Sequence, residues 1–350
     1  MEGESPVPDH NALAAGEIAA LEGFMRAHHI HVNGRLVAEM ISGGKSNLTF
    51  LLSDDVHRWT YRRPPYSGLT PSAHDVGREF HITNCLHGSR VPVARPVLRC
   101  DDPAILGTPF IVTEFVDGRV IRTQENLSEM SDAEVQDCTM ELIRVLVDLH
   151  QIDPASVGLG DLSRRGDYMR RQFDRWAGQW DLVKNDDSPA IDALRRAVAD
   201  ALPKDSASTI THGDYRIDNV IFASDGTSIL AVLDWELAAL GDPLADLAMM
   251  CMYRGHPLDL ILGEQAAWTS ARLLPAEQMA EQYSMLSGRQ LDHWPAYLAF
   301  ANFKLAVVAQ GIVHRARLDP GRTREAARVQ QAVPVLIEQG LRCIALATEA

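Results

Sequence analysis

The stretch Thr211-His-Gly-Asp-Tyr-Arg-Ile-Asp-Asn219 carries most of the information about fold and chemistry. It places Asp214 five residues before Asn219, after one short apolar run and directly before another. The run 229–233 then follows across an Asp-Gly dipeptide, which is a hairpin signal, and it ends at Asp234. The pattern predicts a polar loop between two short strands, followed by a strand that delivers another carboxylate.

These three polar residues fit the chemistry of phosphoryl transfer. In kinases an Asp accepts the proton of the attacking hydroxyl, an Asn five residues later holds a metal ion, and a further Asp binds Mg²⁺. Taken alone, His212, Asp214 and Asp218 would each more often cap a turn. Because the combination rarely arises by accident, we predict Asp214 as the catalytic residue and Asn219 and Asp234 as metal ligands.

The rest of the chain divides into a strand-rich part and a helical part. Strands are expected at 36–41, 48–52, 57–63, 97–100 and 109–115, with helices at 11–28 and 74–87. From Ser131 the pattern becomes helical, because Ser131-Asp-Ala-Glu134 is a capping box and apolar residues then recur every three or four positions. Further helices are expected at 163–184, at 190–202 and after Pro243. We predict an α+β protein with an N-terminal lobe at 1–116 and a helical lobe at 117–350 that contains the loop 211–219 and Asp234.

The turn Gly43-Gly-Lys-Ser46 looks like the end of a Walker A loop but fails its requirements. The motif needs glycine where Glu39 stands, and it needs a helix where this chain continues as a strand. A glycine turn between antiparallel strands suits a flap whose backbone N–H groups approach phosphates. An ordinary hairpin turn explains the same residues equally well.

In order along the chain, these segments resemble the aminoglycoside phosphotransferase and choline kinase-like family of small-molecule kinases. The matching pieces are 42–47, 62–63, Glu79, 114–116, 212–219, Leu233-Asp-Trp-Glu236 and 241–246. The resemblance covers nearly the whole length. It implies a protein-kinase-like two-lobe fold with a small antiparallel β lobe, one inserted helix and a mainly helical second lobe. It also implies ATP and Mg²⁺ as cofactors.

The same resemblance assigns the nucleotide site to the N-terminal lobe. The implied cofactor-binding residues are Gly43, Gly44, Ser46, Asn47, Arg62, Glu79, Glu114 and Val116. Relatives usually carry a lysine on the third strand, paired to a helix glutamate, but here no lysine lies between Lys45 and Lys184. Arg62 or its neighbour Arg63 must take that place, because a guanidinium keeps the charge and binds phosphate in a bidentate manner.

The acceptor is less well defined. Only about eight residues separate Asp234 from Asp242, too few for the segment with which protein kinases bind a peptide, so a small hydroxylated acceptor is expected. An aminoglycoside would need an acidic site, which the excess of acidic residues in 117–250 permits, although Arg315 to Arg328 holds five arginines. Residues 303–317, 62–65 and 69–74 resemble kinase-like domains related to those fused to some acyl-CoA dehydrogenases, which implies hydroxyacyl-CoA-like acceptors. A nucleotide-binding pseudokinase is the alternative, and a choice between ATP and GTP stays open.

Composition and charge limit the partners. The 350 residues are 46% hydrophobic and 23% charged, as in folded soluble proteins, and the net charge of -14 disfavours nucleic acid and anionic membranes. Five scattered cysteines without a C-x-x-C pair suit a reducing cytoplasm, and residues 1–10 lack a signal-peptide pattern. The apolar segment 297–313 is expected to be a buried helix. We predict a cytoplasmic protein without nucleic-acid or membrane partners, and its oligomeric state stays open.

Overall fold

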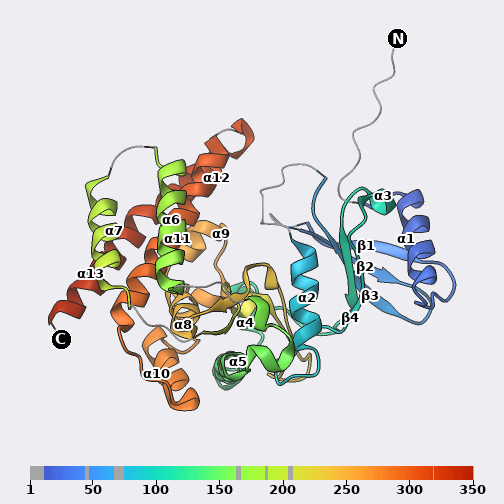
Figure 1. Cartoon of the computed structure of the whole chain (residues 1–350), viewed down its shortest axis with the longest axis horizontal. Coiled ribbons are helices and arrows are strands. Elements are labelled where there is room, and N and C mark those ends of the chain that lie inside the picture. Colours follow the sequence, from blue (N-terminus) through green and yellow to red (C-terminus); the bar gives the residue numbers. More distant parts are fainter. Residues whose placement is uncertain are drawn as a thin grey trace, which may run out of the picture. The chain divides into compact units, whose positions relative to one another are not determined.

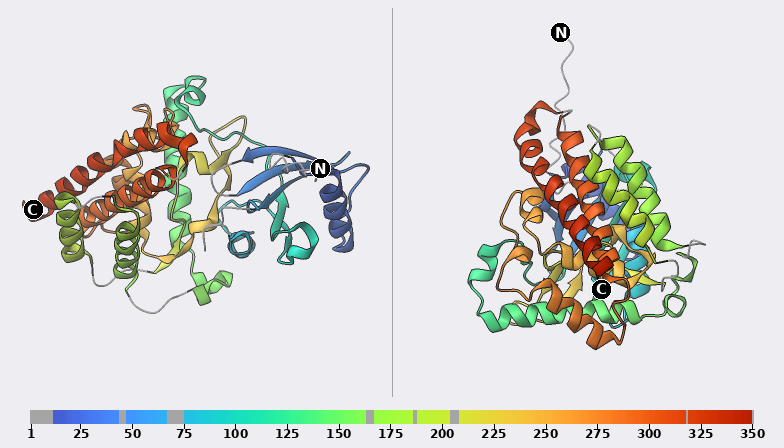
Figure 2. Two further views of the ribbon diagram at one scale, coloured as in Figure 1. Left: turned by 90° about the horizontal axis from the view of Figure 1, so that it is seen from above. Right: turned by 90° about the vertical axis from the view of Figure 1, so that its left-hand side faces the viewer.

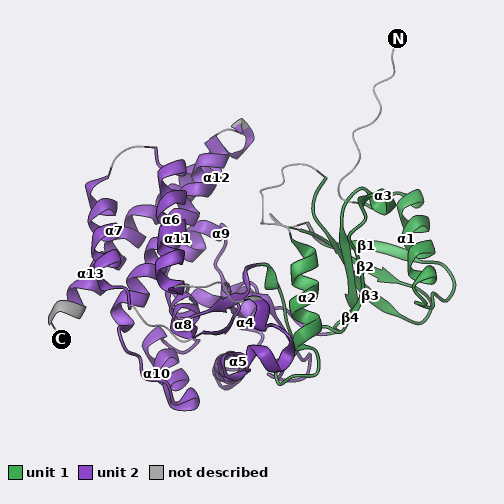
Figure 3. Ribbon diagram, viewed as in Figure 1, with its two compact units in different colours: residues 1–117, 231–236 green, residues 118–230, 237–350 purple. Residues whose placement is uncertain are grey.

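The computed structural model divides the chain into two compact units (Figure 3). Unit 1 comprises Met1–Asp117 with Ala231–Glu236, and unit 2 comprises Gly118–Leu230 with Leu237–Ala350. The structure describes residues 12–43, 47–66, 75–162, 167–185, 188–203, 208–317 and 319–349. The division after Asp117 lies next to the sequence boundary at 116, but unit 1 also includes Asp234, which the predicted division assigns to the second lobe.

Unit 1 is built on a five-stranded antiparallel sheet with the strand order β1-β2-β3-β5-β4 (Figure 1). The strands are β1 (Val37–Gly43), β2 (Leu48–Ser53), β3 (Arg58–Arg63), β4 (Pro96–Cys100) and β5 (Phe110–Glu114). All five lie within two residues of the predicted ranges. The alternation along β3 buries Trp59, Tyr61 and Arg63 on one face of the sheet and directs Arg62 to the other.

The two faces of this sheet have different neighbours. Helix α1 (Ala15–Ala27) contributes Leu21 and Met25 to a hydrophobic core that also contains Phe50, Tyr61 and Phe110. Helix α2 (Val76–Leu86) is capped by the Asp75 carboxylate, packs against β4 and β5 and carries Glu79. A short helix, α3 (Pro103–Leu106), lies between β4 and β5 in the sequence. The sheet therefore separates an apolar core on the α1 face from polar groups on the α2 face.

Unit 2 is mainly helical. In its described part the helices are α4 (Gln124–Ser128), α5 (Asp132–Gln151), α6 (Tyr168–Val183), α7 (Pro189–Ala201), α8 (Pro243–Met252), α9 (Pro257–Leu262), α10 (Ala276–Ser287), α11 (Trp294–Arg317), α12 (Thr323–Gln330) and α13 (Ala332–Glu349). The predicted capping box begins α5, where Ser131 and Glu134 exchange hydrogen bonds, and Pro189 opens α7 as expected. The centre of unit 2 is α11, which packs against α6, α8, α12 and α13 and runs beside α13 in Figure 2.

The predicted buried helix at 297–313 is the core of α11. Among the described residues, α11 alone is long and apolar enough to cross a membrane, and 83% of its apolar window is buried within the structure. That burial is what a central helix of a folded unit shows.

Short strands lie on either side of the loop 212–219. Strand β6 (Thr209–Thr211) pairs with β9 (Ala239–Gly241), and β7 (Val220–Phe222) forms the predicted hairpin with β8 (Ile229–Val232). Strand β9 was not predicted, because three residues followed by Asp242 carry no recognisable strand pattern. The β6–β9 pair and the β7–β8 hairpin flank residues 212–219 along the chain.

Candidate active site

The loop after β6 depends on one backbone conformation. Gly213 has φ +85°, in the left-handed region, and a Cβ there would lie 2.9 Å from the Leu237 carbonyl oxygen. Only glycine fits both constraints without strain. The turn directs the next residue, Asp214, away from the line of β6.

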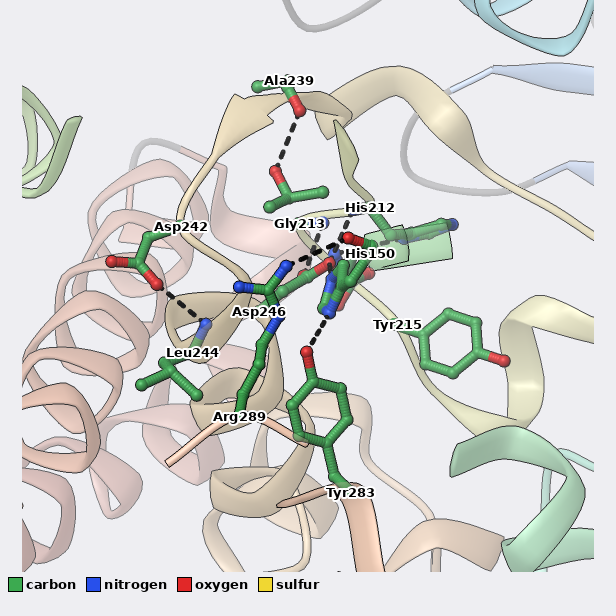
Figure 4. Close-up of polar contacts among 12 residues, drawn as sticks. His150, His212, Gly213, Tyr215, Ala239, Asp242, Leu244, Asp246, Tyr283 and Arg289 are labelled. Carbon is green, nitrogen blue, oxygen red and sulfur yellow. Dashed lines mark hydrogen bonds and ion pairs between the residues drawn. The ribbon is translucent and has the colours of Figure 1, made fainter. Parts of the chain in front are cut away.

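A buried carboxylate holds this turn in place (Figure 4). Asp246 on α8 accepts hydrogen bonds from the backbone N–H groups of His212 (2.6 Å) and Gly213 (2.8 Å). Its Oδ2 also lies 3.3 Å from Nε2 of His150, whose Nδ1 is 2.7 Å from the Tyr283 hydroxyl. Burial raises the pKa of Asp246, but the hydrogen bond and charge of His150 and the contacts with His212 bring it below its usual value. Asp246 therefore stays ionised and fixes the loop.

Asp242 caps the helix that carries Asp246. Its carboxylate accepts from the backbone N–H of Leu244 at 2.8 Å and from the Tyr297 hydroxyl at 2.5 Å. Asp246 therefore positions the loop, and Asp242 caps α8.

Asp214 lies among donors. Its Oδ1 is 3.3 Å from Arg216 Nε, its Oδ2 accepts from Asn219 Nδ2 at 3.2 Å, and the Tyr253 hydroxyl also hydrogen-bonds its carboxylate. Burial raises the pKa of Asp214, whereas Arg216, followed by Tyr253, His212 and Lys304, lowers it, and the pKa lies below its usual value. Asp214 is therefore a carboxylate that is ready to accept a hydrogen bond from a hydroxyl.

The Asn219 amide is oriented by this same loop. Its Nδ2 also donates to the Asp214 carbonyl oxygen at 2.8 Å, so both of its observed hydrogen bonds use the nitrogen end. Among the described residues the amide oxygen has no hydrogen-bond donor. An amide oxygen and carboxylates are the ligands that Mg²⁺ prefers, so the residues present fit this ion.

In unit 1, one arginine joins two acids. Arg62 donates from Nη1 to Glu79 at 3.0 Å and from Nη2 to Asp234 at 2.8 Å. Asp234 has φ +62°, a conformation that residues other than glycine seldom adopt, and strain of this kind is concentrated at functional sites. The predicted pairing of the third-strand arginine with Glu79 is therefore made by Arg62. Arg63 lies on the opposite face of the sheet with its guanidinium 4.0 Å from the ring centroid of Tyr66.

Two polar atoms of the cluster formed by Arg62, Glu79 and Asp234 have no hydrogen-bond partner. Arg62 Nε and Glu79 Oε2 are buried without a hydrogen-bond partner. Burial raises the pKa of Glu79 to about 7, with Arg62 lowering it and the nearby Asp234 and Glu236 raising it. Orphaned polar atoms of this kind are expensive unless a ligand satisfies them.

The predicted glycine turn is described only in part. Gly43 ends β1, while Gly44 and Ser46 lie outside the described residues. Asn47, directly before β2, is buried, and neither its Nδ2 nor its Oδ1 has a hydrogen-bond partner. A buried amide with two orphaned atoms is a suitable site for a polar ligand such as a nucleotide.

The predicted hinge lies at the end of β5. The Glu114 side chain forms an ion pair with Arg95, which lowers the pKa of Glu114. The next residue, Phe115, donates its N–H to the Arg58 carbonyl at 3.2 Å. The Val116 N–H has no hydrogen-bond acceptor among the described residues, so it can donate to the base of a nucleotide.

The predicted site residues thus form one cluster in each unit. Arg62, Glu79 and Asp234 come together in unit 1, and Asp214 and Asn219 come together in unit 2. Asn47, Glu114 and Val116 lie elsewhere in unit 1 and make no hydrogen bond to the arginine cluster.

Several residues that shape the loop were missed by sequence reasoning. They are Arg216, Tyr253, His150, Tyr283 and Lys304. Arg216 had a signal, since it lies inside the loop motif, and Lys304 is one of only four lysines in the chain. The others are distant in sequence, and nothing local marks them.

Comparison with known proteins agrees with this geometry. Residues 37–300 match the model of the phosphotransferase enzyme family. Over 315 residues the chain is 34% identical to acyl-CoA dehydrogenase family member 11 of Gallus gallus, a match that covers 88% of this chain and 40% of that protein. The chain therefore spans less than half the length of this relative.

The solved structures show the same fold. A candidate aminoglycoside phosphotransferase of Ralstonia eutropha has a TM-score of 0.78 and 32% identity, over 93% of this chain and 98% of that one. An aminoglycoside phosphotransferase crystallised with ADP and hygromycin B has a TM-score of 0.59 and 15% identity, over 91% and 98%, and shares the fold alone. These likenesses confirm the predicted α+β, protein-kinase-like fold class. With the family model covering most of its length, the chain belongs to the phosphotransferase enzyme family.

Proposed function

We propose that this protein transfers the γ-phosphoryl group of ATP to a hydroxyl of a small molecule in a Mg²⁺-dependent reaction. The observation that carries the proposal is the pairing of Asp214 with Asn219 on a loop that Asp246 holds by two backbone N–H groups. A turn cap would not need a buried carboxylate beneath it or a left-handed glycine before it.

The residues of unit 1 are assigned to the nucleotide. The Arg62 guanidinium has the charge and fork geometry to bind phosphate oxygens while Glu79 orients it. Asn47, with Gly43, Gly44 and Ser46, is assigned to the phosphates from the glycine turn. Glu114 and Val116 are assigned to the base through their backbone groups, as in kinase hinges.

The residues of unit 2 are assigned to the transfer. Asp214 orients the acceptor hydroxyl and receives its proton as the oxygen attacks phosphorus, while Arg216 and Tyr253 keep its carboxylate in position. Asn219 and Asp234 would hold Mg²⁺, which neutralises charge on the phosphates when it is bound. Catalysis of this kind depends on positioning and charge neutralisation.

Two acceptor classes are in agreement with the relatives. The Ralstonia eutropha protein suggests an aminoglycoside, and the acyl-CoA dehydrogenase family members suggest a hydroxyacyl-CoA. The second is favoured, because residues 303–317 and the other segments named in the sequence analysis resemble the kinase-like domains related to those dehydrogenases.

A nucleotide-binding pseudokinase is the second candidate. The observation that favours it is the ion pair between Arg62 and Asp234, which occupies one oxygen of the proposed metal ligand. The two candidates predict the same nucleotide binding and differ only in turnover.

The test is release of ADP from ATP and Mg²⁺ with a panel of aminoglycosides, choline-like alcohols, hydroxyacyl-CoAs and simple sugars. Asp214→Asn should abolish turnover and keep the stabilisation by Mg²⁺-ATP, because the substitution preserves shape. Asp225→Asn, on the exposed β7–β8 turn, is the matched control and should be fully active. Stabilisation by nucleotide without turnover would favour the pseudokinase, and the absence of both would disprove the proposal.

A further inference from the structure

A lysine from the central helix of unit 2 reaches the catalytic loop. Lys304 on α11 donates from Nζ to the Gly213 carbonyl oxygen at 3.3 Å, and its ammonium lies 5.6 Å from the ring centroid of Trp176. Because Gly213 directly precedes Asp214, an acceptor whose hydroxyl contacts Asp214 lies close to this ammonium. Its charge adds to those that lower the pKa of Asp214.

The charges of Asp214 and Asp246 act on this lysine, but neither carboxylate lies within ion-pair distance of it. In the described part of the chain, Lys304 forms no ion pair within 4.0 Å. The two nearest acids have other partners, because Asp214 accepts from Arg216, Asn219 and Tyr253, and Asp246 accepts from two backbone N–H groups and His150. The single carbonyl bond leaves two of the three ammonium hydrogens unused.

A second cation reinforces the first. Burial lowers the pKa of Lys304, Asp214 and Asp246 raise it, and the charge of Arg175 on α6 lowers it further. The Arg175 guanidinium lies 5.7 Å from the ring centroid of Trp176, so both cations flank that ring. A partly desolvated cation beside another cation is unfavourable unless an anion joins them.

We propose that Lys304 is a specificity-determining residue that binds an anionic oxygen group of the acceptor. The proposal rests on the proposed function and adds one requirement to its acceptor, a carboxylate or phosphate group that reaches Lys304. A hydroxyacyl-CoA meets this requirement only through its phosphates, because its carboxyl is a neutral thioester. A polycationic aminoglycoside is excluded by the same charge. The hydrogen bond to the Gly213 carbonyl does not by itself explain a charged residue at position 304, because a neutral donor could make the same bond.

The test uses the small number of lysines. The chain contains Lys45, Lys184, Lys204 and Lys304, so methylation of each amine is readily followed by peptide mass spectrometry. Formaldehyde condenses with the neutral amine and releases water, and cyanoborohydride reduces the imine. We expect inorganic phosphate or malonate to slow methylation of Lys304 about tenfold at ten times its Kd, because the fraction of free protein is 1/(1 + [L]/Kd). The two anions distinguish a phosphate from a carboxylate preference.

The controls separate this proposal from nucleotide binding. Lys184, at the end of α6, should react at an unchanged rate in both anions at matched ionic strength. Kanamycin should not protect Lys304. The same rate for Lys304 with and without anions, equal protection of all lysines, or no reaction at Lys304 would each overturn the proposal.

A variant tests the same point in binding. Lys304→Met should lose stabilisation by malonate but keep stabilisation by Mg²⁺-ATP, because the lysine is assigned to the acceptor. Malonate is used in this experiment because Arg62 is itself assigned to phosphate. Lys304→Arg should retain both, since it keeps the charge. Equal anion stabilisation of Lys304→Met and the natural protein would contradict the role of Lys304. Loss of the Mg²⁺-ATP effect in the natural protein would instead contradict the proposed function.

Discussion

The Arg62 cluster gives a prediction in which stability and nucleotide binding can be separated. Arg62→Met removes a guanidinium that joins two acids, and the side chains of Arg62, Glu79 and Asp234 are 17%, 9% and 30% exposed. Breaking a buried ion pair costs about 3–5 kcal/mol. In Arg62→Met, water reaches Asp234, and Glu79, whose pKa is already raised to about 7, can bind a proton. We therefore expect the free energy of unfolding to fall by only about 2–3 kcal/mol.

That loss has a visible consequence. It corresponds to a fall in Tm of roughly 5–10 °C for a unit of this size. The Kd for ATP should rise about 10- to 100-fold, the range expected when one charge-assisted phosphate contact is removed. The Tm and the Kd for ATP of Arg62→Lys should lie between those of the natural protein and of Arg62→Met, because a single ammonium replaces a guanidinium that reaches both acids. Scanning calorimetry measures the first effect, and titration calorimetry with ATP measures the second.

Arg63→Met is the matched control. Arg63 is more deeply buried than Arg62 and packs over Tyr66 on the other face of β3, so its loss should lower Tm and leave the Kd for ATP unchanged. The reasoning is refuted if Arg63→Met weakens ATP binding while Arg62→Met does not.

The remaining predictions concern the loop 212–219 and the turn between β2 and β3. Gly213→Ala should reduce kcat at least about tenfold with an unchanged Kd for ATP, because the left-handed turn and the Leu237 contact exclude a Cβ; titration and rate measurements on one preparation check this, and an unchanged kcat would contradict it. His150→Gln should lower kcat modestly, and more than Tyr283→Phe, because His150 contacts Asp246 and Tyr283 does not. Equal effects of the two substitutions on kcat would indicate a packing role alone. For Asp54, burial raises the pKa, but the N–H groups of neighbouring residues lower it to about 2, below the usual 3.8. The stabilisation by ionised Asp54 is therefore complete above pH 4 and is lost as pH falls towards 2. Asp54→Asn should lower the free energy of unfolding in urea by about 1–2 kcal/mol at pH 7 and by about half as much at pH 3. A difference between the two proteins that is constant with pH would contradict the assignment.

Much of this fold was predictable because its signals are local. The alternation in 48–52 and 57–63 requires one face of each strand to be buried, and the capping box at Ser131 needs only four residues. The loop motif also identified Asp214 and Asn219 as a pair, because both lie within one turn. In such segments the sequence neighbours and the spatial neighbours are the same residues.

What could not be predicted depends on distant contacts. The bond from Lys304 to the catalytic loop joins residues 91 positions apart, and the pair of Arg62 with Asp234 joins residues 172 positions apart. The choice between Arg62 and Arg63 rested on which face of β3 meets α2, which periodicity alone does not reveal. Strand β9 forms only because β6 lies beside it.

The central claim is that a phosphoryl group passes from ATP to an acceptor hydroxyl at Asp214. The most direct measurement is the fate of the label from ATP labelled in its γ-phosphate, incubated with Mg²⁺ and the acceptor panel. The account predicts label on one acceptor class with the natural protein and with Asp225→Asn, and none with Asp214→Asn. Label transferred equally well by Asp214→Asn, or found only as free phosphate, would contradict it.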